Sequence, residues 1–257
     1  MRMSISSYSL HRNIGDGSIT MLDFIRIARE RYGVGVVELN SPFFPDVEGY
    51  LDELRQALDR YGVVVRNIAV DMGNVAAADD PERESAVAAN ASWLDVAGAI
   101  GCPSIRVNAG HSEDQDEGLR RSISSFRTIV GRAGELGLSV LMENHGGFSS
   151  DPGGIMAYVR ELGTDNFGTC PDFGNFEEGI RYEALETIAP YAKFVHAKTY
   201  EFDADGNETT LDIPRIIGIM RKSGYDGYVS VEFEGPTDEY EGIDATVALL
   251  RRCGVGD

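Results

Sequence analysis

Four short apolar segments of this sequence each end in a side chain that can bind a metal ion or move a proton. The four side chains are Glu143, Asp172, His196 and Glu232. A charged group at the end of a buried strand is costly unless an opposite charge meets it. Three carboxylates brought together would repel one another, which raises at least one pKa or demands a cation.

We therefore expect the four ends to meet at one divalent metal ion. Three oxygen donors and one imidazole suit Mn²⁺, Mg²⁺, Co²⁺ or Zn²⁺, and the sequence does not choose among them. The alternative is that each carboxylate pairs with a cationic side chain, for which Arg106, Lys198 and Arg181 are the candidates.

Other polar residues also fall at or just past the ends of apolar segments. They are Glu38, Asn40, Asp71, Arg106, Asn108, His111, Asn144, His145, Lys198 and Glu234. Side chains alternate along a strand, so Arg106 shares a face with Asn108, and His196 with Lys198. We expect His111 and His145 to contact a substrate from loops. Lys198 either stabilises a developing oxyanion or forms an ion pair with a neighbouring carboxylate.

The elements that must position these residues follow a repeated pattern, in which a helical segment ends at glycine and an apolar strand follows at once. Strands are predicted at 3–8, 35–40, 64–70, 103–108, 138–143, 167–172, 193–197 and 228–233. Helices are predicted at 19–32, 47–61, 82–100, 115–135, 151–162, 179–189, 212–223 and 240–252.

Eight alternating strand–helix units predict a parallel sheet, and in a chain of 257 residues they predict a closed (β/α)8 barrel, also called a TIM barrel. We expect one domain over residues 1–257. The alternative, an open doubly wound sheet, would be expected to carry a glycine-rich phosphate loop after its first strand, and the sequence has none. Since active sites of such barrels lie at the carboxyl ends of the strands, the polar residues above should converge there.

Composition narrows the range of partners. The net charge is −19 at pH 7, which argues against binding to nucleic acid or to an anionic membrane surface. No apolar run has the length of a membrane span, and residues 1–20 lack the pattern of a signal peptide. Three cysteines without metal-binding spacing exclude a cysteine-based zinc cluster. We therefore expect a cytoplasmic protein.

Four segments, taken together and in order, resemble the sugar phosphate isomerase/epimerase family within the xylose isomerase-like barrel superfamily. These segments are 141–144, 170–175, 194–198 and 224–232. The resemblance implies that Glu143, Asp172, His196 and Glu232 bind the metal and that Glu143 and Glu232 act as acid and base. It also implies that Glu38 and Arg106 face the substrate.

The chain departs from several branches of this family at Asn175, where those branches carry a histidine that touches substrate or a second metal. This difference and the acidic charge weigh against a phosphodiesterase that uses two or three metal ions.

The hypothesis for function is a metal-dependent isomerase or epimerase. It would act on a keto-sugar or related polyol ketone by proton transfer through a metal-stabilised ene-diolate. The first alternative is a dehydratase of the inosose or dehydroshikimate type, and the second is a non-catalytic sugar-binding barrel. We expect an unphosphorylated carbohydrate as the partner. A hairpin predicted at Asp205–Gly206 is of a kind found at subunit contacts, so a homo-oligomer is possible.

Overall fold

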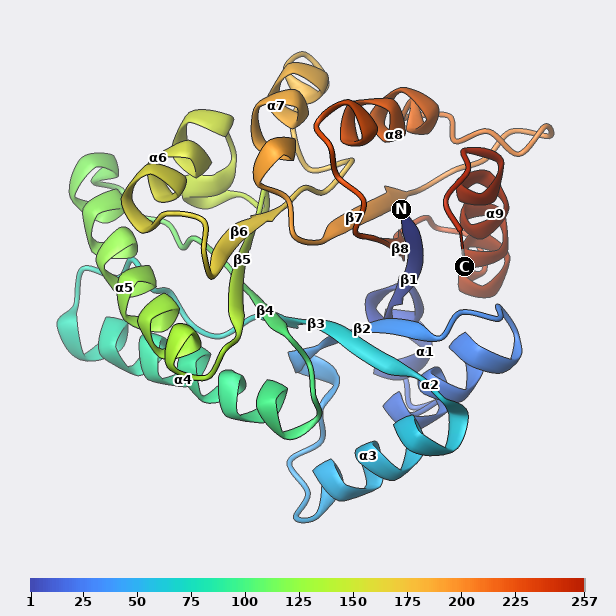
Figure 1. The fold of residues 1–257 in the computed structure, drawn as a ribbon, viewed down its shortest axis with the longest axis horizontal. Coiled ribbons are helices and arrows are strands. Elements are labelled where there is room, and N and C mark those ends of the chain that lie inside the picture. Colours follow the sequence, from blue (N-terminus) through green and yellow to red (C-terminus); the bar gives the residue numbers. More distant parts are fainter. Residues whose placement is uncertain (257) are drawn as a thin grey trace.

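The computed structural model describes residues 1–256, and in this range eight parallel strands form a central sheet with helices on its outside (Figure 1). The strands are β1 (Arg2–Ser6), β2 (Val36–Asn40), β3 (Val64–Val70), β4 (Ser104–Val107), β5 (Ser139–Glu143), β6 (Phe167–Cys170), β7 (Val195–Thr199) and β8 (Tyr228–Phe233). The predicted TIM barrel is confirmed, and the open doubly wound sheet is not found.

Nine helices lie in the described part of the chain. They are α1 (His11–Gly15), α2 (Met21–Glu30), α3 (Tyr50–Tyr61), α4 (Asp80–Ala99), α5 (Gln115–Glu135), α6 (Pro152–Leu162), α7 (Arg181–Ile188), α8 (Ile213–Lys222) and α9 (Glu239–Arg252). Each predicted helix corresponds to one of these, and α1 was not predicted.

Local sequence explains where the helices begin and end. Helix α2 starts at a capping box, in which Thr20 and Asp23 satisfy each other's backbone N–H groups. Helix α3 ends at Gly62, which adopts the left-handed conformation with φ of 61° that glycine takes without strain. The glycines that follow other predicted helices also have positive φ, and they are Gly33, Gly101, Gly137, Gly163 and Gly224.

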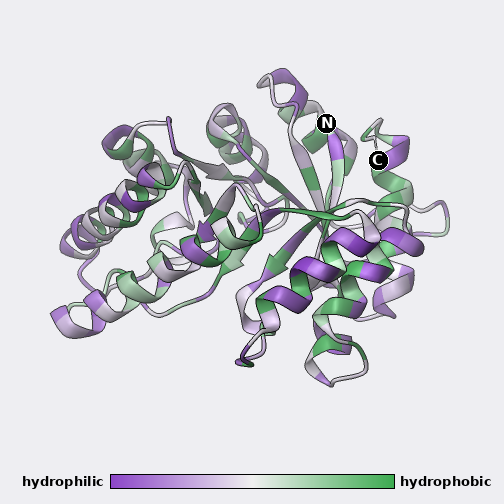
Figure 2. Cartoon of the chain, turned by 60° about the horizontal axis from the view of Figure 1, so that its bottom comes forward, coloured by the Kyte–Doolittle hydropathy of each residue, from purple (hydrophilic) through white to green (hydrophobic). Residues whose placement is uncertain are grey.

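Helices α2 to α9 each bury apolar side chains in the core, whereas α1 buries no residue. In α8 the buried residues Ile213, Ile216, Ile217 and Met220 recur at the spacing of one helix face. Figure 2 shows hydrophilic and hydrophobic residues alternating along the helices around the sheet. No helix among residues 1–256 is both long and apolar enough to cross a membrane.

The barrel closes by an irregular seam. The hydrogen-bonded strand order is β6-β5-β4-β3-β2-β1-β8-β7, so β6 and β7 are the two ends of the sheet. Two isolated parallel bridges join them, Thr169 with Ala192 and Asp172 with His196. The predicted strand 167–172 stops at Cys170 because Pro171 has no N–H to continue a ladder. Two of the four predicted metal ligands therefore lie at this seam.

The first strand is also shorter than predicted. It ends at Ser6, whose side chain accepts a hydrogen bond from the N–H of Tyr8, and a short 3-10 helix, Ser7–Leu10, follows. Beyond the end of β1, the hydroxyl of Ser9 forms hydrogen bonds with the backbone of β8. It donates to the carbonyl of Val231 and accepts from the N–H of Phe233. The predicted hairpin turn at Asp205–Gly206 is present, with an antiparallel bridge between Phe202 and Glu208.

Candidate metal centre

The four predicted ligands come from consecutive strands and lie together, although His196 is the second residue of β7 and not near its end, where the predicted strand 193–197 places it. Glu143 is the last residue of β5, Asp172 follows β6, and His196 and Glu232 lie within β7 and β8. All four are buried, with 0 to 5% of each residue exposed. One potential ligand atom from each lies within 4.8 Å of the others. Strands that are neighbours in the barrel deliver these groups to one point, as the spacing predicted.

The imidazole of His196 stands between two of the carboxylates. Its Nδ1 lies 3.2 Å from Oε1 of Glu143 and 3.3 Å from Oε2 of Glu232. Nδ1 is therefore the nitrogen that faces the other ligands.

A divalent cation fits this donor set. Each of the three carboxylates has one buried oxygen without a hydrogen bond: Oε2 of Glu143, Oδ2 of Asp172 and Oε2 of Glu232. Their nearest charged or imidazole neighbours are Arg106, Lys198 and His196, at 3.1 to 3.8 Å. Buried carboxylate oxygens that lack hydrogen bonds and converge at one point suit an oxygen-preferring cation. With the imidazole they form a first coordination sphere that suits Mg²⁺, Mn²⁺, Co²⁺ or Zn²⁺.

Burial and neighbouring charges shift the pKa values of the clustered carboxyl groups in different directions. Burial, with the nearby charges of Glu232 and Glu143, raises the pKa of Asp172 well above its usual value. Burial also raises the pKa of Glu232. Burial opposes the charge of Glu143 too, but His196 and Arg106 outweigh it and lower the pKa of Glu143. Groups so close with such different environments are typical of functional sites.

Arg106, predicted to face the substrate, lies beside the cluster on β4 and is 4% exposed. Its Nε is 3.1 Å from Oε2 of Glu143, as an ion pair. Its Nη1 donates to Asp71 and to Asn108, each at 2.7 Å, and the amide of Asn108 also donates to Asp71. Asp71 thus orients two predicted substrate residues at the rim, where it is about one-third exposed itself.

Lys198 forms the ion pairs that were one of its two predicted roles. Its Nζ forms an ion pair with Glu234 at 3.0 Å and lies 3.8 Å from Oδ2 of Asp172. It donates to Oδ1 of Asn175 at 2.9 Å, and the amide of Asn175 donates to Oε1 of Glu143 at 3.0 Å. Asn175, noted in the sequence only as a departure from the family, therefore links Lys198 to a candidate ligand.

The two loop histidines differ in their placement. His145 lies two residues beyond Glu143, the last residue of β5, and is exposed. His111 is exposed as well, and its backbone forms the hydrogen bonds that join it to Asn74. The structure thus places His145 close in the chain to the end of β5 and holds His111 against Asn74 through its backbone.

Glu38, which the family resemblance implied to face the substrate, lies beside His196. Its side chain is fully buried, and its Oε1 is 2.9 Å from Nε2 of His196. The same oxygen accepts a hydrogen bond from the amide of Asn67 at 2.7 Å. Sequence reasoning missed Asn67, for which the only signal was a single amide inside the apolar strand Val64–Val70.

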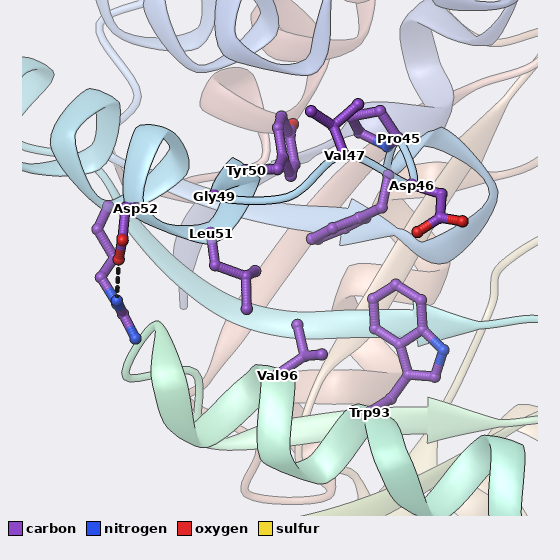
Figure 3. A pocket seen from close by; sticks show the side chains of 11 residues that line it. Pro45, Asp46, Val47, Gly49, Tyr50, Leu51, Asp52, Trp93 and Val96 are labelled. Carbon is purple, nitrogen blue, oxygen red and sulfur yellow. Dashed lines mark hydrogen bonds and ion pairs between the residues drawn. The ribbon is translucent and has the colours of Figure 1, made fainter.

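Aromatic residues border the site on the side of β1 and β2. The ring of Tyr8 stacks on His11 at 4.7 Å and on Phe43 at 6.2 Å between centroids. The next residue, Phe44, instead packs edge-on against Trp93 in a separate surface pocket (Figure 3). None of the candidate metal ligands lines that pocket.

Solved structures with the same fold cover nearly the whole chain. An L-ribulose 3-epimerase superposes with a TM-score of 0.81 at 18% identity, covering 98% of this chain and 94% of that one. A 3-keto-D-glucoside 4-epimerase from E. coli gives 0.77 at 17% identity, covering 98% and 100%. The probable 3-DHS dehydratase of petrobactin synthesis from Bacillus anthracis gives 0.75 at 17% identity, covering 98% and 99%. These similarities show the fold.

Two curated relatives match a shorter part. A C-glycoside deglycosidase alpha subunit from Arthrobacter globiformis is 52% identical over 73 residues, which are 26% of this chain and 21% of that subunit. The corresponding subunit from Microbacterium trichothecenolyticum is 34% identical over 68 residues, 25% and 18% of the two chains. The matched stretch therefore spans about one-fifth of either relative.

The family described as xylose isomerase-like TIM barrel matches residues 25–253, which is most of the sequence. Together with the eight-stranded parallel barrel, this match shows that the chain belongs to the xylose isomerase-like TIM barrel family.

Proposed function

We propose that this protein is a divalent-metal-dependent isomerase or epimerase. It would move a proton at a carbon next to the carbonyl of a keto-sugar or a related polyol ketone. The observation that carries the proposal is the buried cluster, in which oxygens of Glu143 and Glu232 lie 3.2 and 3.3 Å from Nδ1 of His196 and each carboxylate keeps a buried oxygen without a hydrogen bond. The epimerases among the structures with this fold support the class of substrate.

Glu143, Asp172, His196 and Glu232 would hold one cation, either Mg²⁺, Mn²⁺, Co²⁺ or Zn²⁺. When bound, it would act as a Lewis acid on the carbonyl and make the adjacent C–H more acidic.

Glu143 and Glu232 would carry the proton. One carboxylate removes it from the carbon, and the other returns a proton from its own side. General acid–base catalysis of this kind contributes about 10² to 10⁴ in rate. Return to the opposite face of the same carbon gives epimerisation, whereas return to the neighbouring carbon gives isomerisation. Epimerisation by this route needs one group on each face of the carbon, and the two carboxylates would supply them.

The cationic side chains would stabilise negative charge that develops on the substrate oxygens. Lys198, held by Glu234 and Asn175, approaches from β7, and Arg106 approaches from β4. Asn108, His111 and His145 would contact the hydroxyl groups of the substrate from the rim. Substrate recognition thus falls to residues at the mouth, and proton transfer to the buried cluster.

A second candidate is a lyase, which the identity of 52% with a C-glycoside deglycosidase alpha subunit favours. Removal of the same proton can be followed by loss of a substituent from the next carbon. Loss of a hydroxyl would make the enzyme a dehydratase, and loss of a larger group would make it a deglycosidase. The two candidates share the residues above and differ in the product.

Metal analysis followed by a solvent-exchange screen tests the proposal. The protein, loaded with Mn²⁺, is incubated in deuterated water with a panel of keto-sugars, inososes and keto-glycosides, and the products are identified by NMR. We expect deuterium at one carbon next to the carbonyl, and loss of this exchange in Glu143→Gln. The exposed Glu84→Gln on α4 serves as the control. Full exchange in Glu143→Gln, or a protein that holds no metal, would refute the proposal.

A further inference from the structure

A buried polar chain crosses the barrel and ends at the nitrogen of His196 that faces away from the other ligands. Ser104 on β4 contacts Asn67 on β3 at 2.7 Å, and Asn67 donates to Glu38 on β2 at 2.7 Å. Glu38 in turn contacts Nε2 of His196 on β7 at 2.9 Å. These four residues are 0 to 6% exposed, so water does not compete for their hydrogen bonds.

An irregular strand register builds this chain. Val37 pairs with Val65, but the next residue, Glu38, pairs with Asn67, so that Arg66 is an extra residue in β3. A shift of one residue moves side chains to the other face of a sheet, and bulges that do this are concentrated near active sites. Because of the shift, the amide of Asn67 lies opposite Glu38 and donates to it.

We propose that Glu38 is a positioning residue that sets the tautomer of His196 for metal binding. A carboxylate at Nε2 favours a proton on that nitrogen, so Nδ1 is left with its lone pair directed at the other ligands. The inference rests on the proposed metal function and adds to it the residue that prepares one of the four ligands. It also gives Glu38 a role different from the substrate contact that the resemblance implied.

The surroundings of Glu38 agree with this role. A fully buried carboxylate is costly, and an apolar residue of similar size would pack at this position without that cost. Oε1 of Glu38 already receives Asn67 and His196, while Oε2 is buried without a partner. Oε1 of Glu38 is therefore directed to the imidazole.

Two substitutions at Glu38 separate the proposed role from simple packing. Glu38→Leu removes the acceptor for Nε2, whereas Glu38→Gln keeps an acceptor and removes only the charge. We expect Glu38→Leu to weaken binding of Zn²⁺ about 10- to 100-fold, as measured by calorimetry, and Glu38→Gln to weaken it less. In long-range ¹H–¹⁵N spectra of the Zn²⁺-loaded protein, the Nε2 proton of His196 should be protected from solvent exchange in the wild type and in Glu38→Gln, and unprotected in Glu38→Leu.

Asn67→Leu provides a variant that leaves both Glu38 and His196 in place, and we expect a smaller loss of affinity from it. The matched control is Glu239→Gln. Glu239 is also a buried carboxylate, but it accepts hydrogen bonds from Arg12 and Asn13 and contacts none of the candidate metal ligands. If Glu38→Leu does not fold, Glu38→Gln and Asn67→Leu decide, and unchanged Zn²⁺ affinity in both would overturn the inference. If the wild type and every Glu38 variant bind Zn²⁺ equally well, only the positioning role is refuted. If the wild type binds no metal, the proposed function is refuted as well.

Discussion

Asp172 and His196 pair with each other across the junction between β6 and β7, the place where the barrel is joined by isolated bridges. The N–H of His196 donates to the carbonyl of Pro171, and the N–H of Phe173 donates to the carbonyl of His196. Both residues are also candidate metal ligands, so a bound cation would tie together the two edges of the sheet.

Removal of metal should therefore loosen this seam. We expect faster hydrogen exchange of the backbone amides of His196 and Phe173 after chelation, because a local opening there breaks few other strand contacts. Amides of the regular ladder between β1 and β8 should exchange at the same rate in both forms. Mass spectrometry of deuterated peptides measures this. Equal changes in both regions would show that the metal acts on global stability and not on the seam.

The stabilising effect of metal should grow with pH. In the metal-free protein, burial raises the pKa of Asp172 and of Glu232. A carboxyl group whose pKa is raised by folding stabilises the folded state at low pH and loses that contribution as pH rises through its folded value. A cation also binds only the deprotonated groups.

Thermal unfolding with Mn²⁺ and with a chelator, measured between about pH 5 and about pH 8, tests this expectation. The difference in melting temperature between the two samples should widen toward the higher pH. A difference that stays constant, or that narrows, would contradict the assigned pKa directions.

Arg106→Met should destabilise the fold and abolish turnover. The substitution leaves Glu143 without the buried cation at 3.1 Å and leaves Asp71 without its main partner. Removing one partner of a buried ion pair lowers the free energy of unfolding by about 3 to 5 kcal/mol, which urea denaturation measures. The control is Arg127→Met, which removes an exposed ion pair with Glu161 and should cost at most about 1 kcal/mol.

Lys198→Met should lower kcat and leave the metal content unchanged. Lys198 contacts Glu234 and Asn175 and approaches the ligands without being one of them. If it stabilises charge on the substrate, its loss should reduce kcat by about 10² to 10³. Lys222→Met, at an exposed position on α8, is the control. Normal kcat in Lys198→Met would show that the lysine serves only as an ion-pair partner.

Much of this architecture could be predicted from the sequence alone, because it depends on local patterns. Apolar strands alternate with amphipathic helices, and glycines such as Gly62 mark the helix ends through their own backbone preference. The carboxyl ends of parallel strands meet on one face of a barrel, which is why strand position alone predicts that Glu143 and Glu232 lie together.

The tertiary structure decided what depends on register and on contacts across the barrel. The extra residue at Arg66 brings Asn67 opposite Glu38, and nothing in the local sequence marks that shift. The same non-local geometry directs Oε1 of Glu38 to His196, and places Asn175 between Lys198 and Glu143. Strand pairing sets these contacts between residues far apart in the chain, so composition and periodicity, which are local, carry no information about them.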